Sequence, residues 1–356
     1  MAEPLKYLYN EGFISKLSKE LREAYKDFNS DAFTATVFDA QWDALELKER
    51  MRHISRTLEE FLPSEYPKAL SILKKAAPQF SGFEPMIFPD FVEVFGLDDY
   101  DESIQALEHF TKYSSSEFAV RPFILKYPDM MRQMKVWTGS DNEHVRRLAS
   151  EGCRPRLPWA MALPAFKEDP TLVLEILEKL KDDLSEYVRR SVANNLNDIS
   201  KDHPAKVKSV AKDWMGKTKE GDWIVKHACR TLLKAGDTEV LALFGFTSPE
   251  TITMSEFQVA KSVKMGSDVE FSFKLKSTKE LGKLRLEYAI GFLRKNGKHN
   301  QKVFKISESD IKDVEKSINK KHSFKSISTR KYYLGIHQLV VIINGVAFAQ
   351  EEFELY

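Results

Sequence analysis

The chain has 356 residues, of which 42% are hydrophobic and 30% are charged, with a formal net charge of +1. This composition excludes a disordered chain, and the length predicts two domains. Two cysteines, Cys153 and Cys229, exclude a disulfide framework and a cysteine-rich zinc site. No apolar run approaches the roughly 18 residues that span a bilayer, and the N-terminus lacks the apolar core of a signal peptide. We therefore expect a cytoplasmic protein that is not bound to a membrane.

The first part of the chain has helical periodicity. Apolar residues share one helical face in two long segments: Leu45, Leu47, Met51, Ile54, Leu58 and Phe61, and then Leu172, Leu174, Ile176, Leu177 and Leu180. Residues 142–149, 185–192 and 222–229 also resemble one another, because in each a polar residue opens a helix, a Val begins an apolar stripe and a basic residue follows. Residues 116–121 are a fainter copy.

The valines of these copies, at positions 120, 145, 188 and 225, are 25, 43 and 37 residues apart. The last two intervals are close to the period of a two-helix HEAT-type repeat. The sequence therefore predicts an α-solenoid, in which the same helix of each pair lines an extended concave surface.

The pattern changes near residues 246–249. Residues 269–275 alternate apolar and polar side chains, which predicts a half-buried strand. Asn296-Gly297 and Asn344-Gly345 each separate two apolar segments, and both dipeptides favour two-residue hairpin turns because they tolerate positive φ. We predict a helical domain at residues 1–246 and an all-β sandwich at residues 250–356.

Charge is divided unequally between these regions. Residues 250–356 contain 19 Lys or Arg and 13 Asp or Glu, a net charge of +6, whereas residues 1–249 carry −5. A basic domain favours a polyanion through phosphate contacts. A solvated lysine-rich surface explains the same excess, and charge alone does not decide between the two.

The residue patterns do not favour metal or cofactor chemistry. The eight histidines have no pair at ligand spacing, and the chain has neither a glycine-rich phosphate loop nor a serine nucleophile elbow, so we expect no metal and no cofactor. Three carboxylates remain, with Glu117 at the start of one repeat helix and Glu151 and Asp198 at the ends of two others. Negative charge is disfavoured at a helix C-terminus, so the presence of a carboxylate at two such positions indicates a function. Alternatively, Glu117 is a capping acid and the other two are solvated loop residues.

The segment after Glu151 is irregular. Residues 152–159 read Gly-Cys-Arg-Pro-Arg-Leu-Pro-Trp, which is too rich in proline to continue a helix. This combination favours binding of nucleic acid that carries a cationic lesion. Arginines can bind phosphates, an aromatic ring can contact a base or sugar, and carboxylates can bind the cation. Alternatively, salt bridges hold the arginines within the solenoid and the tryptophan belongs to a core.

Two stretches carry a specific resemblance. Residues 145–159 and residues 187–204, which contain Asn-Asn-Leu-Asn-Asp-Ile-Ser at 194–200, resemble the HEAT-like repeat DNA glycosylases. Within that superfamily the chain is most similar to the AlkC type of 3-methyladenine DNA glycosylase. The likeness extends upstream through residues 88–92 and 116–123, and members of this type carry a C-terminal immunoglobulin-like domain that helps to hold the duplex.

The resemblance implies a monomeric, monofunctional enzyme that excises cationic alkylated bases from duplex DNA in the bacterial cytoplasm, where DNA binding associates it with the nucleoid. It implies that Glu151, Asp198 and Glu117 surround the lesion, with Glu151 and Asp198 stabilising the sugar cation and orienting water. The residues expected to contact substrate or DNA are Trp159, Arg147, Arg154, Arg156, Arg190 and Asn195. Acceptance of 3-methylcytosine stays open, as does the choice between a flipped and a stacked base.

Two other functions also stay open at this point. A HEAT-repeat protein without catalytic activity can bind a protein or a nucleic acid on its concave face. An RNA-directed binder or repair factor has the same sequence features. Release of bases from methylated duplex DNA separates the glycosylase from both.

Overall fold

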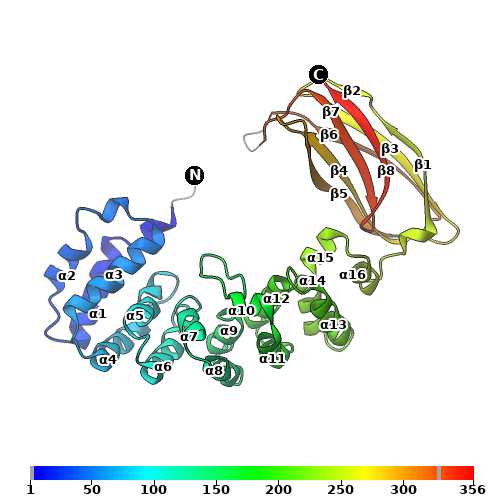
Figure 1. Ribbon diagram of the computed structural model, residues 1–356. Coiled ribbons are helices and arrows are strands. Elements are labelled where there is room, and N and C mark those ends of the chain that lie inside the picture. The colour runs from blue at the N-terminus through cyan, green and yellow to red at the C-terminus, as the bar shows by residue number, and fades with distance from the viewer. Residues whose placement is uncertain (1–3, 327–329) are drawn as a thin grey trace. The chain divides into compact units, whose positions relative to one another are not determined.

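The computed structural model describes residues 4–326 and 330–356, and it has a helical region followed by a β-rich region (Figure 1). The chain forms two compact units. The first ends at Ala228 and omits residues 208–212, which belong to the second unit with residues 229–356. No helix among the described residues is long and apolar enough to cross a membrane.

The α-helices are α1 Glu11–Ala24, α2 Ser30–Val37, α3 Leu47–Phe61, α4 Tyr66–Ala76, α5 Ile87–Phe95, α6 Tyr100–Phe110, α7 Val120–Lys126, α8 Met130–Trp137, α9 Glu143–Glu151, α10 Pro164–Glu168, α11 Thr171–Leu180, α12 Glu186–Ile199, α13 Pro204–Trp214, α14 Lys219–Ala228, α15 Arg230–Ala235 and α16 Thr238–Leu243. Short 3₁₀-helices are η1 Leu5–Leu8, η2 Trp42–Ala44, η3 Ala77–Gln79, η4 Glu84–Met86 and η5 Pro249–Thr251. The strands are β1 Ile252–Val259, β2 Ser262–Val263, β3 Asp268–Ser277, β4 Gly282–Leu293, β5 His299–Ile311, β6 Glu315–Ser323, β7 Gly335–Ile343 and β8 Val346–Leu355.

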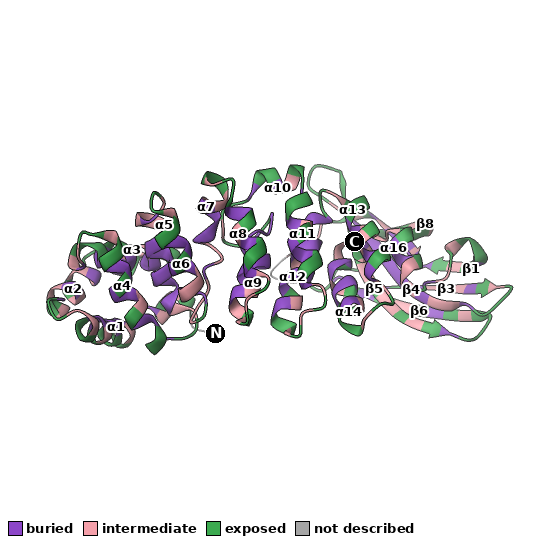
Figure 2. Ribbon diagram, turned by 90° about the horizontal axis from the view of Figure 1, so that it is seen from below, coloured by how far each residue is buried: buried purple, intermediate pink, exposed green. Residues whose placement is uncertain are grey.

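The repeated segments form helices that bury their valines. Asn142 caps α9, because its side-chain oxygen accepts hydrogen bonds from the first-turn N–H groups of His144 and Val145. Val145 and Val188 are fully buried, as are the valines at 120 and 225, which confirms the predicted apolar stripe. Figure 2 shows buried stretches along the neighbouring helices α9, α11 and α12.

Two predicted helix starts are wrong. Helix α14 begins at Lys219 rather than at Asp222, because Thr218 accepts a hydrogen bond from the Gly221 N–H and caps the helix one turn earlier. Helix α7 begins at Val120, and Glu117 lies in the turn before it. One predicted face is also incorrect. Leu172 is 51% exposed, since α11 buries positions 173, 176, 177 and 180 instead.

The β-strands form two sheets with one apolar core between them. The first has the order β1-β3-β6, and the second has the order β2-β8-β7-β4-β5, with every neighbouring pair antiparallel except β2 with β8. Strand β3 alternates buried and exposed residues, as predicted, so Val269, Phe271, Phe273 and Leu275 enter the core. An α-helical repeat region followed by a β-sandwich is therefore confirmed.

Both predicted hairpins are present, but the two-residue turn is confirmed only between β7 and β8, because five residues join Leu293 of β4 to His299 of β5. Asn344 and Gly345 join β7 to β8 with φ of 47° and 81°, and Gly297 in the β4–β5 turn has φ of 75°. Gly345 also packs against the backbone of Gly236, where a Cβ on Gly345 would lie 2.1 Å from the Gly236 carbonyl oxygen. This contact ties the β7–β8 turn to the end of α15 within the second unit.

We expect Gly345→Ala to destabilise the protein more than Gly297→Ala does. Both variants place a Cβ at positive φ, which costs roughly 1 kcal/mol. Only Gly345 also has a backbone neighbour, whereas a Cβ on Gly297 would meet nothing within 4 Å. Urea unfolding should show a further loss of about 2 kcal/mol for Gly345→Ala. Equal losses would contradict the close contact with Gly236.

The β-sandwich also contains a buried histidine that predicts a pH response. The Tyr288 hydroxyl and Nδ1 of His322 share a hydrogen bond of 2.9 Å, and burial lowers the pKa of His322 to about 4. Because the pKa is lower in the folded state than the usual unfolded value of about 6.5, the sandwich is most stable above pH 6.5 and loses stability as the pH falls toward 4. The urea unfolding midpoint of the wild type should fall as the pH is lowered from 6.5 to 4. His322→Phe should remove this part of the fall, and the exposed His299 provides the control.

Candidate functional site

A cavity of about 490 Å³ opens among the segment at η4, the segment that precedes α7, helices α9 and α12, and the loop that follows α9. Its walls are mainly aromatic and apolar, and they include Phe83, Phe118, Leu157, Trp159 and Tyr187. Four charged side chains also line it: Glu117, Arg147, Glu151 and Arg154. All of these residues belong to the first compact unit. Aromatic walls with carboxylates are suited to a flat cationic ring.

The acids are held by the ends of repeat elements. Glu151 is the last residue of α9, Asp198 lies in the last turn of α12, and Glu117 precedes α7. Glu151 is 5% exposed and Asp198 is 2% exposed, so neither is a solvated loop residue. Two buried carboxylates at helix C-termini are costly, and such an arrangement requires compensation by nearby cations.

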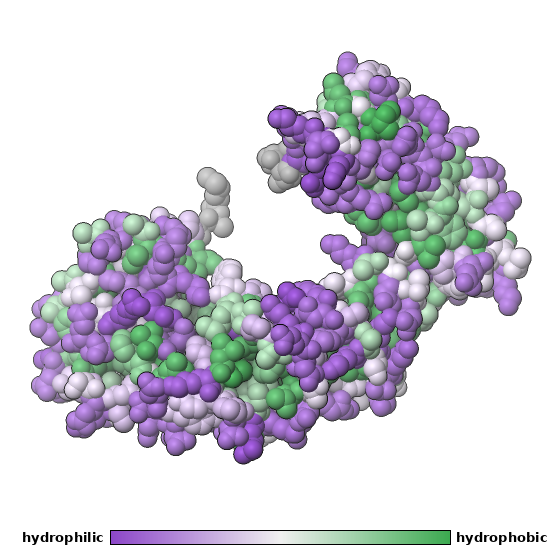
Figure 3. Space-filling view, in the orientation of Figure 1, coloured by the Kyte–Doolittle hydropathy of each residue, from purple (hydrophilic) through white to green (hydrophobic). Residues whose placement is uncertain are grey.

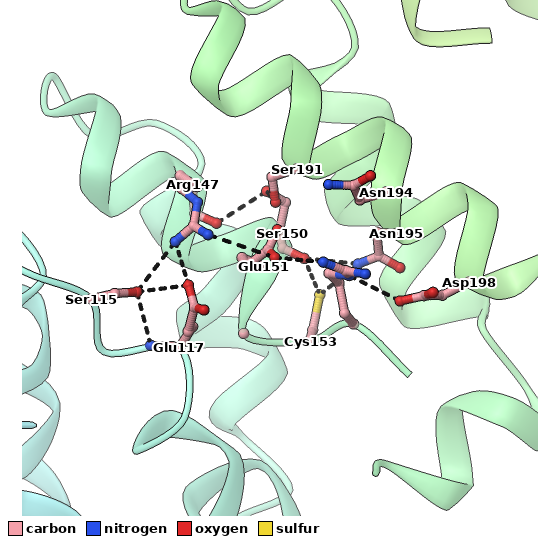
Figure 4. Close-up of polar contacts among 12 residues, drawn as sticks. Ser115, Glu117, Arg147, Ser150, Glu151, Cys153, Ser191, Asn194, Asn195 and Asp198 are labelled. Atoms are coloured by element: carbon pink, nitrogen blue, oxygen red, sulfur yellow. Dashed lines mark hydrogen bonds and ion pairs between the residues drawn. The ribbon is translucent and has the colours of Figure 1, made fainter. Parts of the chain in front are cut away.

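Arg147 provides part of that compensation. Its guanidinium donates to Glu117, and its second terminal nitrogen lies 3.6 Å from Oε1 of Glu151 (Figure 4). Ser115 donates to the same Glu117 oxygen at 2.7 Å. The guanidinium also lies over the Tyr187 ring, 4.7 Å from its centroid. Burial lowers the pKa of Arg147, but the carboxylates of Glu117 and Glu151 outweigh that effect and raise it.

Arg154 connects the other two acids. Nη1 donates to Oε1 of Glu151 at 2.6 Å, and Nε donates to Oδ2 of Asp198 at 2.9 Å. Arg154 is 7% exposed, so this double ion pair is buried. Lys201 donates to the other Asp198 oxygen at 3.2 Å. Three carboxylates are thus balanced by three cations. Figure 4 shows the acids Glu117, Glu151 and Asp198 in a row.

The carboxylates differ in their access to the cavity. Glu117 and Glu151 line it, whereas Asp198 is not among its lining residues. Each of the two lining acids has one oxygen that accepts no hydrogen bond from any described residue, since Oε2 of Glu117 and Oε1 of Glu151 receive the contacts above. These two oxygens are available to a ligand.

The loop after α9 is anchored by a second buried arginine. Arg121 is fully buried and donates to the backbone carbonyls of Gly152, Arg154 and Met161 at 2.7–2.8 Å. Burial lowers its pKa to about 10. Because three carbonyls of one loop converge on a single guanidinium, residues 152–161 have a fixed path without regular secondary structure.

Trp159 projects from this loop. It is 63% exposed and has φ of 65°. The Ala160 N–H bonds to the Leu157 carbonyl, so Pro158 and Trp159 are the central residues of a turn with the features of type II, in which glycine is favoured at the second central position. Lys48 of α3 donates to the Trp159 carbonyl at 2.8 Å. An exposed tryptophan in a left-handed conformation indicates function rather than packing.

Comparisons with known proteins agree with this arrangement. The chain is 52% identical to the protein YhaZ of Bacillus subtilis over 344 residues, which is 96% of each chain. It is 36% identical to the alkylpurine DNA glycosylase AlkC of Pseudomonas fluorescens, solved bound to DNA containing an abasic site analog, with a TM-score of 0.87 over 99% of this chain and 100% of that chain. Residues 93–232 match the DNA alkylation repair enzyme family. The chain belongs to that family. Residues 253–356 match the C-terminal Ig-like domain of YhaZ, so the predicted immunoglobulin-like domain is confirmed.

The remaining predicted site residues of this DNA alkylation repair enzyme lie outside the cavity lining. Arg156 donates to Asp202 at 2.6 and 3.1 Å, and Arg190 donates to Glu186 at 2.6 Å, both as exposed pairs. Asn195 is fully buried, and its amide donates to the Ser150 carbonyl at 2.8 Å. The structure therefore brings Glu117, Glu151, Asp198, Arg147 and Arg154 together, with Trp159 at the rim, and holds the others apart from this cluster.

Sequence reasoning predicted Trp159 but missed the other aromatic walls. Tyr187 directly precedes Val188, at the same repeat position that His144 has before Val145, and the two rings lie 5.6 Å apart in an edge contact. Aligning the copies would have placed Tyr187 beside the helix that carries Arg147. Phe83 gives no such signal, because it comes from an irregular segment more than 60 residues upstream of Glu151.

Proposed function

We propose that this protein is a monofunctional DNA glycosylase that hydrolyses the N-glycosidic bond of cationic alkylated bases, above all 3-methyladenine, in duplex DNA. The observation that carries the proposal is the cavity in which Glu117 and Glu151 each present a free carboxylate oxygen between aromatic walls. A cationic purine finds there both opposite charge and ring faces. In this proposal the protein is a cytoplasmic monomer that acts on the DNA of the nucleoid.

The chemistry follows from the leaving group. Methylation at N3 makes adenine cationic, so the electron pair of the C1′–N9 bond leaves with the base and makes it neutral. Positive charge then accumulates on the sugar, as in the oxocarbenium-like transition state of glycoside hydrolysis. Glu151 stabilises that charge and accepts a hydrogen bond from the water that attacks C1′. Water supplies the hydroxyl of the abasic sugar and releases a proton to solvent.

The other acids support the same step. Glu117 closes the cation site from the other side of Arg147, and Asp198 contributes negative charge through Arg154. No lysine is among the described residues that line the cavity. A lyase step requires an amine nucleophile, so this lining favours simple hydrolysis that leaves an abasic site. Water attack is therefore the step that we assign.

Contacts with DNA come from exposed residues. Trp159 is placed to contact the damaged nucleotide, and Arg156 and Arg190 carry exposed guanidinium groups that can exchange their carboxylate partners for phosphates. Asn195 supports the site through its buried contact with Ser150. The β-sandwich adds a second basic surface.

That surface is a cleft of about 630 Å³ between the β4–β5 turn and residues 330–333. Arg294, Lys295, Arg330 and Lys331 line it with Phe292 and Tyr333, and the Arg330 guanidinium lies 4.2 Å from the Phe292 ring centroid. Figure 3 shows a strongly hydrophilic surface at this end of the β-domain. Basic and aromatic side chains in one cleft fit a nucleic-acid backbone.

We expect the double variant Arg294→Ala/Lys295→Ala to bind duplex DNA more weakly than the wild type. Each phosphate contact that is lost should reduce the slope of log K against log salt by about one. Fluorescence anisotropy at several salt concentrations measures both quantities. Lys279→Ala, an exposed lysine outside the cleft, is the control. Unchanged affinity and slope in the double variant would place this cleft away from DNA.

The proposed activity is tested directly with methylated DNA. The protein is incubated with duplex DNA treated with a methylating agent, and released bases are separated by chromatography. We expect 3-methyladenine to be released and the abasic strand to stay intact until alkali is added. Strand cleavage without alkali would contradict monofunctional hydrolysis, and binding without base release would favour a non-catalytic nucleic-acid-binding protein.

A further inference from the structure

The role of Arg154 differs from that of an arginine that binds phosphate. A phosphate ligand keeps its terminal nitrogens accessible, as the half-exposed Arg190 does. The side chain of Arg154 is 8% exposed, and it uses Nη1 and Nε on two different carboxylates. The Arg154 guanidinium therefore binds carboxylates inside the protein.

The backbone at Arg154 is also held in place, by hydrogen bonds from Arg121. Arg121 donates to the carbonyl of Arg154 itself at 2.8 Å and to the carbonyl of Gly152 at the same distance. Arg121 comes from α7, Glu151 from α9 and Asp198 from α12. One buried arginine thus fixes the backbone from which a second arginine reaches across to two further helices.

The geometry of a guanidinium makes this bridge directional. Its planar, fixed set of N–H groups defines where each accepting oxygen lies, whereas a lysine ammonium is a single point charge. Arg154 occupies Oε1 of Glu151, a residue of the cavity lining, and leaves Oε2 without a hydrogen bond from any described residue. It also separates Glu151 from Asp198, whose negative charges would otherwise repel each other in a buried place.

We propose that Arg154 is a positioning residue: its bridge between Glu151 and Asp198 orients the Glu151 carboxylate toward the cavity and holds both acids in fixed places. This inference rests on the proposed glycosylase function, because Glu151 is the acid that faces the reacting sugar. Arg154 itself contacts neither the substrate nor the DNA backbone. The charged neighbours of the bridge are Glu117, Arg147, Lys201 and Arg121. Its other titratable neighbours are Tyr187 and Cys153.

Two substitutions test the bridge. Arg154→Lys keeps the positive charge but cannot hold both carboxylates, and Arg154→Met removes the charge with similar length. We expect the single-turnover excision rate to fall about 10-fold for Arg154→Lys and about 100-fold for Arg154→Met, the latter being typical of losing an aligned electrostatic group. The affinity for duplex DNA and its salt slope should stay within twofold of the wild type.

Arg146→Met is the matched control. Arg146 lies on α9, the helix that ends at Glu151, and makes an ion pair with Asp183, whose side chain is 5% exposed, with contacts of 2.6 and 3.0 Å, outside the cavity lining. Its loss should lower Tm without changing the excision rate of the folded protein. A rate that falls equally in Arg146→Met and Arg154→Met would reduce Arg154 to a structural role and overturn the proposal. Weaker DNA binding with a salt slope lowered by about one in Arg154→Met would make Arg154 a phosphate ligand instead.

A stability measurement tests the bridge independently of activity. Arg154→Met leaves two buried carboxylates without their partner, so its Tm should fall, and adding Glu151→Gln and Asp198→Asn should recover more than half of that loss. Additive losses would show that no bridge exists. If the wild type releases no base from methylated DNA but the Tm cycle shows this recovery, the proposed function fails while the bridge is retained. If Arg154→Met does not fold, the excision rate is measured on Arg154→Lys, and the stability cycle is measured on Arg154→Lys with and without Glu151→Gln and Asp198→Asn.

Discussion

Glu151→Gln should lower the single-turnover excision rate by about 10²-fold or more while the protein stays folded. The amide has the shape of the carboxylate and can still accept the hydrogen bond that Arg154 donates to Oε1. It lacks the negative charge that faces the sugar cation, and the loss of one such aligned group in a dry site typically costs this much. Rates measured on a duplex with a single 3-methyladenine, with enzyme in excess, isolate the chemical step.

The matched control is Glu143→Gln at the opposite end of the same helix. Glu143 is the first residue of α9, accepts a hydrogen bond from Ser185 and does not line the cavity. It should excise at the wild-type rate. If Glu151→Gln excises at a rate near that of the wild type and its far-UV circular dichroism spectrum shows that it is folded, Glu151 takes no part in the mechanism. We expect Asp198→Asn to slow excision as well, because it removes the negative charge beside Arg154.

Much of the helical fold could be predicted because burial in a solenoid repeats along the chain. The valines at 145 and 188 are both buried at the same position of successive repeats. A repeated sequence pattern therefore predicts which residues pack between the helices. Helix starts were less predictable, since they depend on single capping contacts such as that of Thr218 with Gly221. The hairpin at Asn344 was predictable because positive φ restricts the residue type.

The site was predictable in its residues but not in their pairing. The position of Glu151 at a helix C-terminus marked it as unusual, and the resemblance assigned it a role. Sequence could not show that Arg154 turns inward to two acids while Arg156, two positions later, pairs at the surface. Side-chain directions in an irregular loop depend on distant anchors, and here the anchor is Arg121, which precedes the loop by some 30 residues.

The position of Trp159 combines local strain with exposure, which separates the needs of stability from those of activity. Glycine is the favoured residue at the second central position of a type II turn, so Trp159 holds a left-handed conformation at a cost of roughly 1 kcal/mol. Its side chain is 63% exposed and gains little from burial. On stability alone, this residue would be replaced by glycine.

We therefore expect Trp159→Gly to raise or retain the Tm and to slow excision by about 10-fold or more, with a smaller loss of DNA affinity. Trp159→Ala is the matched variant, because it removes the same ring but keeps a Cβ at φ of 65°. The two variants should excise equally slowly, and the glycine variant should be more stable by roughly 1 kcal/mol. Urea unfolding and single-turnover kinetics measure the two effects. An alanine variant as stable as the glycine variant would contradict the strained turn, and a wild-type rate in both would show that the ring takes no part in excision.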